Sequence, residues 1–251
     1  PEGAWVFYRL AASDTIERRF ADAALAMLDF ADPILARDRS RLSEIRAARD
    51  AAAAAYFERN AEDWDRVRAL HLPEADIESA ILAAAGPGPF GLMVDVGVGQ
   101  GRMIQLFADR VGRAEGFDTS RQMLSIARAT LDDLRAKAAV RFGDAYAPPL
   151  PANSADLVTI HQVLHFLADP ARAVAESARL LRHGGRLVII DFAPHTLEFL
   201  REEHAHRRLG FSDGEIAAWC ASAGLGRMKT TTLAPQKRDA LTVKIWAGVK
   251  A

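Results

Sequence analysis

The stretch Val94-Asp95-Val96-Gly97-Val98-Gly99-Gln100-Gly101 carries the clearest structural signal in the chain. It ends an apolar run that begins at Leu92, and it leads into residues 101–108, which have a helical pattern. Glycines between a strand and a helix let the backbone turn tightly, and they let a ligand approach the unpaired N–H groups at the helix start. The stretch therefore predicts a ligand-binding loop at the carboxyl end of a strand.

Short apolar runs alternate with helical patterns around and after this loop. The runs lie at 92–96, 114–117, 139–142, 157–160 and 186–192. The intervening helical stretches have about 10–15 residues, the length of βαβ crossovers, and near-continuous apolar runs are typical of parallel strands covered on both faces. Residues 228–233 and 241–249 are β-prone with no room for a helix between them, so we expect an antiparallel pair. The fold class predicted is α/β, with a Rossmann-like doubly wound sheet.

The first 85 residues have helical patterns instead. We expect one helix from a capping box at Asp14 and Glu17 through Phe30, and a second from Pro33 toward Tyr56. Shorter helices are expected at 64–70 and 74–85. The segment Gly86-Pro87-Gly88-Pro89 breaks the pattern. We therefore divide the chain into an N-terminal helical region, 1–85, and a ligand-binding domain, 86–251.

Composition narrows the classes of function. A net charge of −1 gives no general attraction to nucleic acid or to an acidic membrane. The single cysteine, Cys220, excludes a disulfide within the chain and argues against a cysteine-based metal site. We expect no metal site. No apolar run reaches about 20 residues, so we also expect no membrane span. The near-absence of cysteine predicts a reducing, cytoplasmic location. The chain begins at Pro1, so we expect that further residues could precede it.

Two classes of cofactor compete for the glycine loop. Dinucleotide sites use G-x-G-x-x-G, which places a pyrophosphate on the helix start. Counted from Gly97, the third glycine of that pattern falls at Arg102, and the chain has G-x-G-x-G preceded by Asp95 instead. S-adenosylmethionine has no phosphate, and its ammonium needs an acidic or carbonyl partner. The loop, with Val98 between its glycines, favours S-adenosylmethionine, and Asp95 either faces the ammonium or orients the loop. A glycine turn without a ligand is the structural alternative.

Acids also follow the next two predicted strands. Asp118 can accept hydrogen bonds from both ribose hydroxyls of an adenosine, or it can cap the helix that follows, and both roles can hold together. We place Thr119 in the same site, and Met123 either lines an adenine slot or packs in the core. In Gly143-Asp144-Ala145, the acid can accept the adenine amino group or can be a solvated turn residue.

These motifs resemble those of class I S-adenosylmethionine-dependent methyltransferases over about residues 50–251, and the ubiquinone/menaquinone-biosynthesis type is the most similar subgroup. The resemblance implies a seven-stranded sheet whose last strand is antiparallel, and methyl transfer to a small-molecule acceptor. It assigns Asp95–Gly101 to the first motif, Asp118 to the ribose and 143–145 to the adenine. It further implies that the region of Tyr56 covers the cofactor as a lid, although helix packing would also explain the aromatic residues there.

Histidines follow the fourth predicted strand. Methyl transfer needs positioning above all, and a general base only when the acceptor carries a proton that must leave. We predict that His161 contacts the cofactor and that His165 faces the acceptor, with both as candidate catalytic residues; structural hydrogen-bonded histidines are the alternative. His204 and His206 are two residues apart and would not share a helix face, which argues against a metal site. One of them, or Arg207, could line an acceptor pocket.

A second resemblance concerns the beginning of the chain. Residues 3–10 are similar to the second wing strand of arsenic-repressor (ArsR) type winged-helix regulators, in which a long dimerising helix follows, and residues 14–30 lie in its place. This implies a homodimer formed by N-terminal helices, and a DNA partner only if a winged-helix head precedes Pro1. The alternative function is then sensing of S-adenosylmethionine or S-adenosylhomocysteine; an ordinary N-terminal strand is the structural alternative. Because Cys220 alone cannot hold arsenite, we exclude arsenite as an acceptor.

Overall fold

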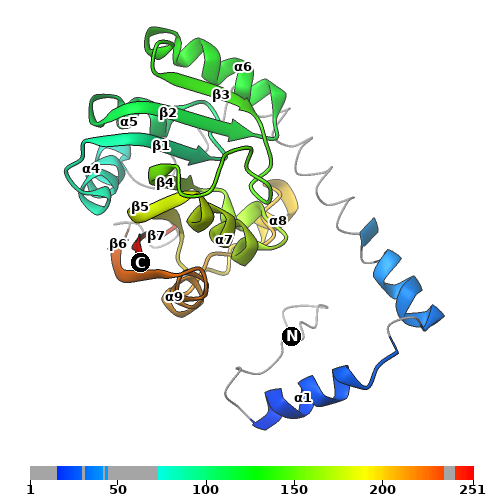
Figure 1. Cartoon of the computed structure of the whole chain (residues 1–251). Helices are drawn as coiled ribbons and strands as arrows, with labels where there is room; N and C mark the ends of the chain where they lie inside the picture. Colours follow the sequence, from blue (N-terminus) through cyan, green and yellow to red (C-terminus); the bar gives the residue numbers. More distant parts are fainter. Residues whose placement is uncertain (1–15, 30–31, 42, 45–72, 235–240) are drawn as a thin grey trace. The chain divides into compact units, whose positions relative to one another are not determined.

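The computed structural model describes residues 16–29, 32–41, 43–44, 73–234 and 241–251 (Figure 1). The chain divides into two compact units, Pro1–Arg49 and Asp50–Ala251. Several predictions fall outside the described residues. They concern the wing-like residues 3–10, the cap at Asp14, the lid at Tyr56 and the helix at 64–70. No helix in the described part of the chain is long and apolar enough to cross a membrane.

The first unit contains helix α1, Ile16–Ala26, and a second helical stretch at 33–41. Pro33 opens that second stretch, as predicted, whereas α1 ends earlier than the Phe30 that we expected. Apolar side chains of this unit are exposed to an unusual degree: Ile16 is 80% exposed, Phe20 78% and Met27 83%. Ile16 and Phe20 are four residues apart on α1 and therefore share one face of the helix, and Met27 directly follows its end.

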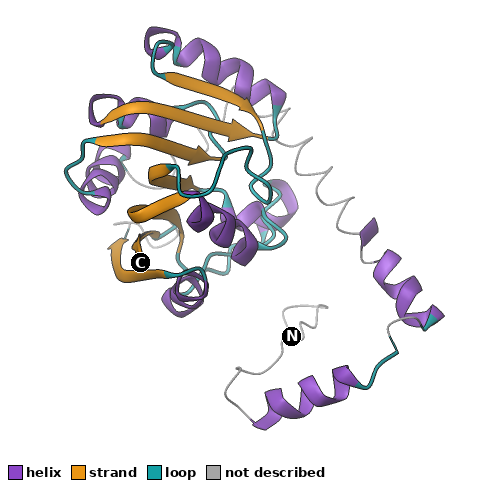
Figure 2. Cartoon of the chain, viewed as in Figure 1, coloured by secondary structure: helices purple, strands orange, loops and turns teal. Residues whose placement is uncertain are grey.

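The second unit is built on one seven-stranded sheet with the order β3-β2-β1-β4-β5-β7-β6. Its strands are labelled in Figure 1, and they are orange in Figure 2. β1 to β5 are parallel, and β7 pairs antiparallel with both β5 and β6. The predicted Rossmann-like sheet, with its antiparallel last strand, is therefore confirmed. The strands are β1 Phe90–Val96, β2 Val111–Asp118, β3 Ala138–Phe142, β4 Ala155–His161, β5 Leu181–Phe192, β6 Leu225–Leu233 and β7 Val243–Lys250.

Helices pack on both faces of this sheet, and each face has its own apolar core. On one face, α4 (Glu74–Ala85), α5 (Arg102–Leu106) and α6 (Arg121–Thr130) contribute Ile81, Ile104 and Leu124. On the other face, α7 (Pro170–Leu180) and α9 (Asp213–Ser222) contribute Val174 and Ile216. The remaining elements are short: α8 (Phe199–Glu203), η1 (Ala108–Arg110), η2 (Asp132–Leu134) and η3 (Leu164–Phe166).

Helix α4 has the bounds that the sequence predicted, but it packs with the sheet. Its residues Ile77, Ile81 and Ala85 are buried in the same core as strand residues such as Met93. The second compact unit thus includes α4 and begins at Asp50, ahead of the Gly86–Pro89 break. The reason is that α4 is apolar on the face that meets the sheet and cannot bury that face alone.

Candidate cofactor and acceptor site

The glycine loop joins β1 to α5 at the carboxyl edge of the parallel strands. Gly97, Gly99 and Gly101 have φ values of 71°, 49° and 92°, a region of backbone conformation that other residues adopt only with strain. The N–H groups of Gly97 and Val98 both donate to the carbonyl oxygen of Phe117, at 2.9 and 3.0 Å. These bonds fix the loop against the end of β2.

The glycines of this loop differ in what surrounds them. A Cβ at Gly97 would lie 2.4 Å from Val163 Cγ2, and one at Gly101 would lie 2.9 Å from Leu131 Cδ1. A Cβ at Gly99 would meet no atom within 4 Å. Gly97 and Gly101 are therefore required by packing within the protein. Gly99 faces open space, as a backbone segment that lies against a ligand would.

The carboxylate of Asp118 is bonded to this loop. Its Oδ2 accepts from the N–H of Gly99 at 2.9 Å, and its Oδ1 accepts from the N–H of Ser120 at 2.8 Å. Burial raises the pKa of Asp118, and hydrogen bonds from the backbone of Ser120, Gly99 and Thr119 act in the opposite direction. The cap of α6 is Ser120, whose hydroxyl accepts from Met123 N, so Asp118 does not itself cap the helix.

Asp95 is buried on β1 and binds a residue of the neighbouring strand. Thr159 Oγ1 on β4 donates to Asp95 Oδ1 at 2.6 Å. This contact joins β1 and β4, the two strands from which the sheet extends in opposite directions. Ligands of open α/β sheets bind at such a point. The contact orients the Asp95 carboxylate at this point of the sheet, and both of its predicted roles stay predictions.

The predicted adenine motif lies next to the same loop. Gly143 N donates to the carbonyl oxygen of Asp118 at 3.1 Å, and Asp144 follows directly. Asp144 is exposed, and its Oδ1 accepts from the N–H of Tyr146 at 2.9 Å. Thr119 is exposed beside Asp118, whereas Met123 is buried on α6. The structure thus brings the glycine loop, Asp118 and the 143–145 segment together.

The two candidate catalytic histidines have different environments. His161 ends β4 and is half-buried. His165 lies in η3 and is only 1% exposed, with its Nδ1 2.7 Å from Asp191 Oδ1. Because a carboxylate only accepts hydrogen bonds, Nδ1 carries the ring proton in this contact. An acceptor could reach His165 only if the packing around it opened, while His161 needs no such change.

The buried His165–Asp191 pair anchors the segment after α8. The ring of His206 stacks on that of His165 with centroids 4.1 Å apart, and the N–H groups of Arg207 and Arg208 donate to the carbonyl oxygen of His165. Asp191 Oδ1 also accepts from Phe192 N, and in the described part of the chain its buried Oδ2 has no hydrogen-bond partner. Among the described residues, which include His204 and His206, no group of three or more potential metal ligands occurs.

Sequence reasoning missed several members of this site. Asp191 is a polar residue within the apolar run 186–192, which was an available signal. Thr159 is a hydroxyl within an otherwise apolar strand. Val163, which closes the space above Gly97, left no signal because an apolar residue in a loop has many possible neighbours.

An open depression of about 510 Å³ occurs elsewhere on the second unit. It lies where the chain enters β1 and β2, so it is at the opposite edge of the sheet from the glycine loop. Its lining residues are Ser79, Leu82, Ala83, Gly86, Pro87 and Arg110.

Comparison with known proteins finds a methyltransferase domain in this part of the chain. Residues 94–189 match the family model of a methyltransferase domain. The matched segment runs from the last part of β1 into β5, so it holds the glycine loop, Asp118, Asp144 and both candidate histidines. A demethylmenaquinone methyltransferase of Renibacterium salmoninarum is 33% identical over 116 residues, which are 46% of this chain and 47% of that protein. The matches span only 33% to 50% of the curated relatives compared.

Solved methyltransferase structures share the fold. A possible histamine N-methyltransferase of Thermotoga maritima superposes with a TM-score of 0.63 at 23% identity, over 79% of this chain and all of that one. A phosphoethanolamine N-methyltransferase of Haemonchus contortus, in complex with S-adenosylhomocysteine, gives 0.61 at 18% identity, over 70% of this chain and 52% of that one. The second unit therefore has the class I methyltransferase fold.

Proposed function

We propose that the second unit transfers a methyl group from S-adenosylmethionine to a small-molecule acceptor. The observation that carries this proposal is the hydrogen bond from Gly99 N to Asp118 Oδ2, beside the open space at Gly99. It joins a glycine turn and a carboxylate into one surface at the carboxyl edge of the sheet. The match of residues 94–189 to a methyltransferase domain supports the same conclusion.

The residues present fit this cofactor. Asp118 would accept from the ribose hydroxyls, Asp144 would accept from the adenine amino group, and the backbone of Gly97–Gly101 would lie along the amino-acid end. When bound, S-adenosylmethionine supplies a methyl group on a sulfonium, so the leaving group belongs to the cofactor. The protein then has to position the acceptor and exclude water.

We assign proton acceptance to His161 where the acceptor carries a proton. It is half-buried at the end of β4, next to the glycine loop, because Ile160 is paired in the sheet with Val96. A base in that place is close to the strand ends at which acceptors of such folds bind. We assign His165 and Asp191 a supporting role, since their contact holds residues 206–208 against η3.

Calorimetry with S-adenosylhomocysteine and transfer of label from methyl-labelled S-adenosylmethionine into a metabolite extract test the proposal together. We expect binding, and label in a small-molecule fraction. His161→Gln should reduce the transfer far more than it reduces the affinity for S-adenosylhomocysteine, which His161 is also expected to contact. His183→Gln is the matched control, because His183 is exposed near the start of β5, at the edge of the sheet opposite to His161.

The two measurements separate the alternatives. Absence of S-adenosylhomocysteine binding would refute the proposed site. Binding without transfer to any fraction would favour a sensing domain, the alternative that the regulator-like residues 3–10 suggested. The comparisons do not favour that alternative, because the named relatives and neighbours are methyltransferases.

A further inference from the structure

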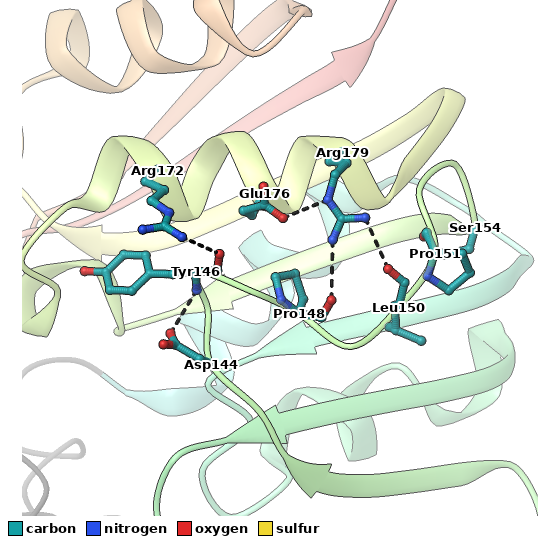
Figure 3. A network of polar contacts seen from close by, with 9 residues as sticks. All are labelled: Asp144, Tyr146, Pro148, Leu150, Pro151, Ser154, Arg172, Glu176 and Arg179. Atoms are coloured by element: carbon teal, nitrogen blue, oxygen red, sulfur yellow. Dashed lines mark hydrogen bonds and ion pairs between the residues drawn. The ribbon is translucent and has the colours of Figure 1, made fainter.

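The segment that joins β3 to β4 begins with the adenine motif and then runs alongside α7 (Figure 3). It contains Pro148, Pro149 and Pro151, which have no N–H to donate. Such a segment cannot pair as a strand, so its carbonyl oxygens need donors from another element. The arginines of α7 provide these donors.

Two arginines of α7, one at each end of the segment, donate hydrogen bonds to its carbonyl oxygens. Arg172 Nη2 donates to the carbonyl oxygen of Tyr146 at 3.3 Å. Arg179 donates to the carbonyl oxygens of Pro148 and Leu150, at 3.4 and 3.2 Å, and its Nε is bonded to Glu176 (Figure 3). Residues 172 and 179 are two helical turns apart and therefore lie on one face of α7. The segment is fixed along its length to a helix that is itself packed on β4 and β5.

Tyr146 is held through its ring, its hydroxyl and its backbone. The guanidinium carbon of Arg172 lies 5.3 Å from the centre of the Tyr146 ring, a cation–π distance. The Tyr146 hydroxyl accepts from the N–H of Asp169 at 2.9 Å, and Asp169 is the residue that caps α7. The N–H of Tyr146 donates to Asp144 Oδ1. Tyr146 thus transmits the position of α7 to the carboxylate of Asp144.

We propose that Arg172 and Tyr146 are positioning residues for recognition of the adenine base by Asp144. The inference rests on the proposed function, which places the adenine of the cofactor at Asp144. The N–H of Tyr146 binds Oδ1 of Asp144 and fixes the orientation of the carboxylate. Oδ2 of Asp144 then accepts a hydrogen bond from the exocyclic amino group of the adenine. A purine with an oxygen in place of that amino group would set a second acceptor against the carboxylate, which is unfavourable.

This arrangement differs from a contact that only stabilises the fold. If Arg172 merely strengthened the segment, its loss would lower the melting temperature and weaken all cofactor analogues equally. If it holds Asp144 in place, its loss would weaken binding of the amino-purine and leave the oxo-purine almost unchanged. The ratio of the two affinities therefore separates the two roles.

The experiment is calorimetry of the intact chain with S-adenosylhomocysteine and with S-inosylhomocysteine, its 6-oxo analogue. We expect the wild-type protein to prefer the adenosyl compound. Arg172→Met and Tyr146→Phe should each reduce that preference by about three- to tenfold, the effect of one lost hydrogen bond. Arg172→Lys, which keeps a donor but loses the planar group, should fall between Arg172→Met and the wild type.

Arg135→Met is the control, because Arg135 is exposed and paired with Asp132 outside this segment. It should leave both affinities unchanged. An equal loss of both affinities in Arg172→Met and Tyr146→Phe, or an unchanged ratio, would overturn the inference. If Arg172→Met does not fold, Tyr146→Phe removes only the hydroxyl and decides alone. A wild-type protein that binds neither compound would refute the proposed function itself, which is a separate result.

Discussion

Gly99 donates its backbone N–H to Asp118 Oδ2 at 2.9 Å, so the loop after β1 and the acid at the end of β2 form one unit. The two residues are 19 positions apart, and each lies in a motif that was recognisable alone. The bond shows that Asp118 has a structural partner in the protein before any ribose is added. Its carboxylate is therefore oriented in advance of binding, which lowers the entropy lost when a ligand binds.

Removal of the carboxylate tests its role in binding. Asp118→Ala should weaken the binding of S-adenosylhomocysteine by roughly 1–3 kcal/mol, the usual range for a lost charged hydrogen-bond partner. Isothermal titration calorimetry would measure the difference. Asp132→Ala, at an exposed site outside the motif, is the control. An unchanged affinity in Asp118→Ala would remove Asp118 from the site.

A bulky side chain at Gly99 should block the site without disrupting the core. A Cβ there meets no protein atom within 4 Å, so the cost to the fold of Gly99→Val is the strain at φ 49°, about 1–2 kcal/mol. Gly184 also has positive φ and open surroundings, but it lies far from the site at the start of β5. Gly184→Val should show a similar fall in melting temperature and unchanged affinity, and only Gly99→Val should lose binding. Equal affinities in the two variants would contradict the assignment.

The pKa of Asp118 gives a pH dependence whose sign follows from linkage. Because burial raises this pKa above 3.8, the folded protein holds the proton more tightly than the unfolded chain does. The contribution of Asp118 to stability therefore falls as the pH rises from 3.8 through the raised value. Denaturant unfolding at several pH values should show the wild type losing stability relative to Asp118→Ala across that window. If the stability of the wild type relative to Asp118→Ala stays constant or rises with pH, the raised pKa of Asp118 is contradicted.

The exposed apolar side chains in and just after α1 offer a test of the homodimer that the sequence predicts, which stays a prediction. Ile16, Phe20 and Met27 are each about four-fifths exposed, and a patch of this kind is typical of an interface. Analytical ultracentrifugation should show Phe20→Asp shifting the protein toward monomer. Arg19→Asp, which changes charge at an exposed position of the same helix, should not. A wild-type protein that is monomeric at micromolar concentration would contradict the expectation.

Cys220 should behave as an inert core residue. Burial raises the pKa of its thiol to about 11, so only about one thiol in a thousand is ionised at pH 8. Iodoacetamide should modify the folded protein far more slowly than the same protein in urea, as peptide mass spectrometry would show. Equal rates would mean that α9, which buries Cys220, opens readily.

The sequence was sufficient to predict the sheet because apolar runs mark the buried centres of strands. It could not predict where strands begin: β5 starts at Leu181 instead of Arg186, since exposed residues such as Arg182 and Gly184 extend the strand past its buried part. The helix expected at 101–108 is divided into α5 and η1. Local patterns contain no information on such ends when tertiary packing decides them.

The same limit applies to the site. Gly97–Gly101, Asp118 and Asp144 were predictable because each belongs to a local strand-to-turn motif. The His165–Asp191 pair and the contact of Arg172 with Tyr146 join residues 26 positions apart in each case. Contacts of this kind depend on which strands are neighbours and on which helix covers them. Tyr56 and the wing-like residues 3–10 lie outside the described residues, so their roles stay predictions.

The place of β7 has a consequence for synthesis. β7 lies between β5 and β6, although both of those strands are made before it. While residues up to 233 are emerging from the ribosome, β5 and β6 lack their shared partner, and each presents an open row of backbone donors and acceptors. Open edges of this kind pair readily with other chains. We expect nascent chains to need chaperones when residues up to 233, but not yet 243, have emerged from the ribosome, and to be released from that need once residue 250 has emerged.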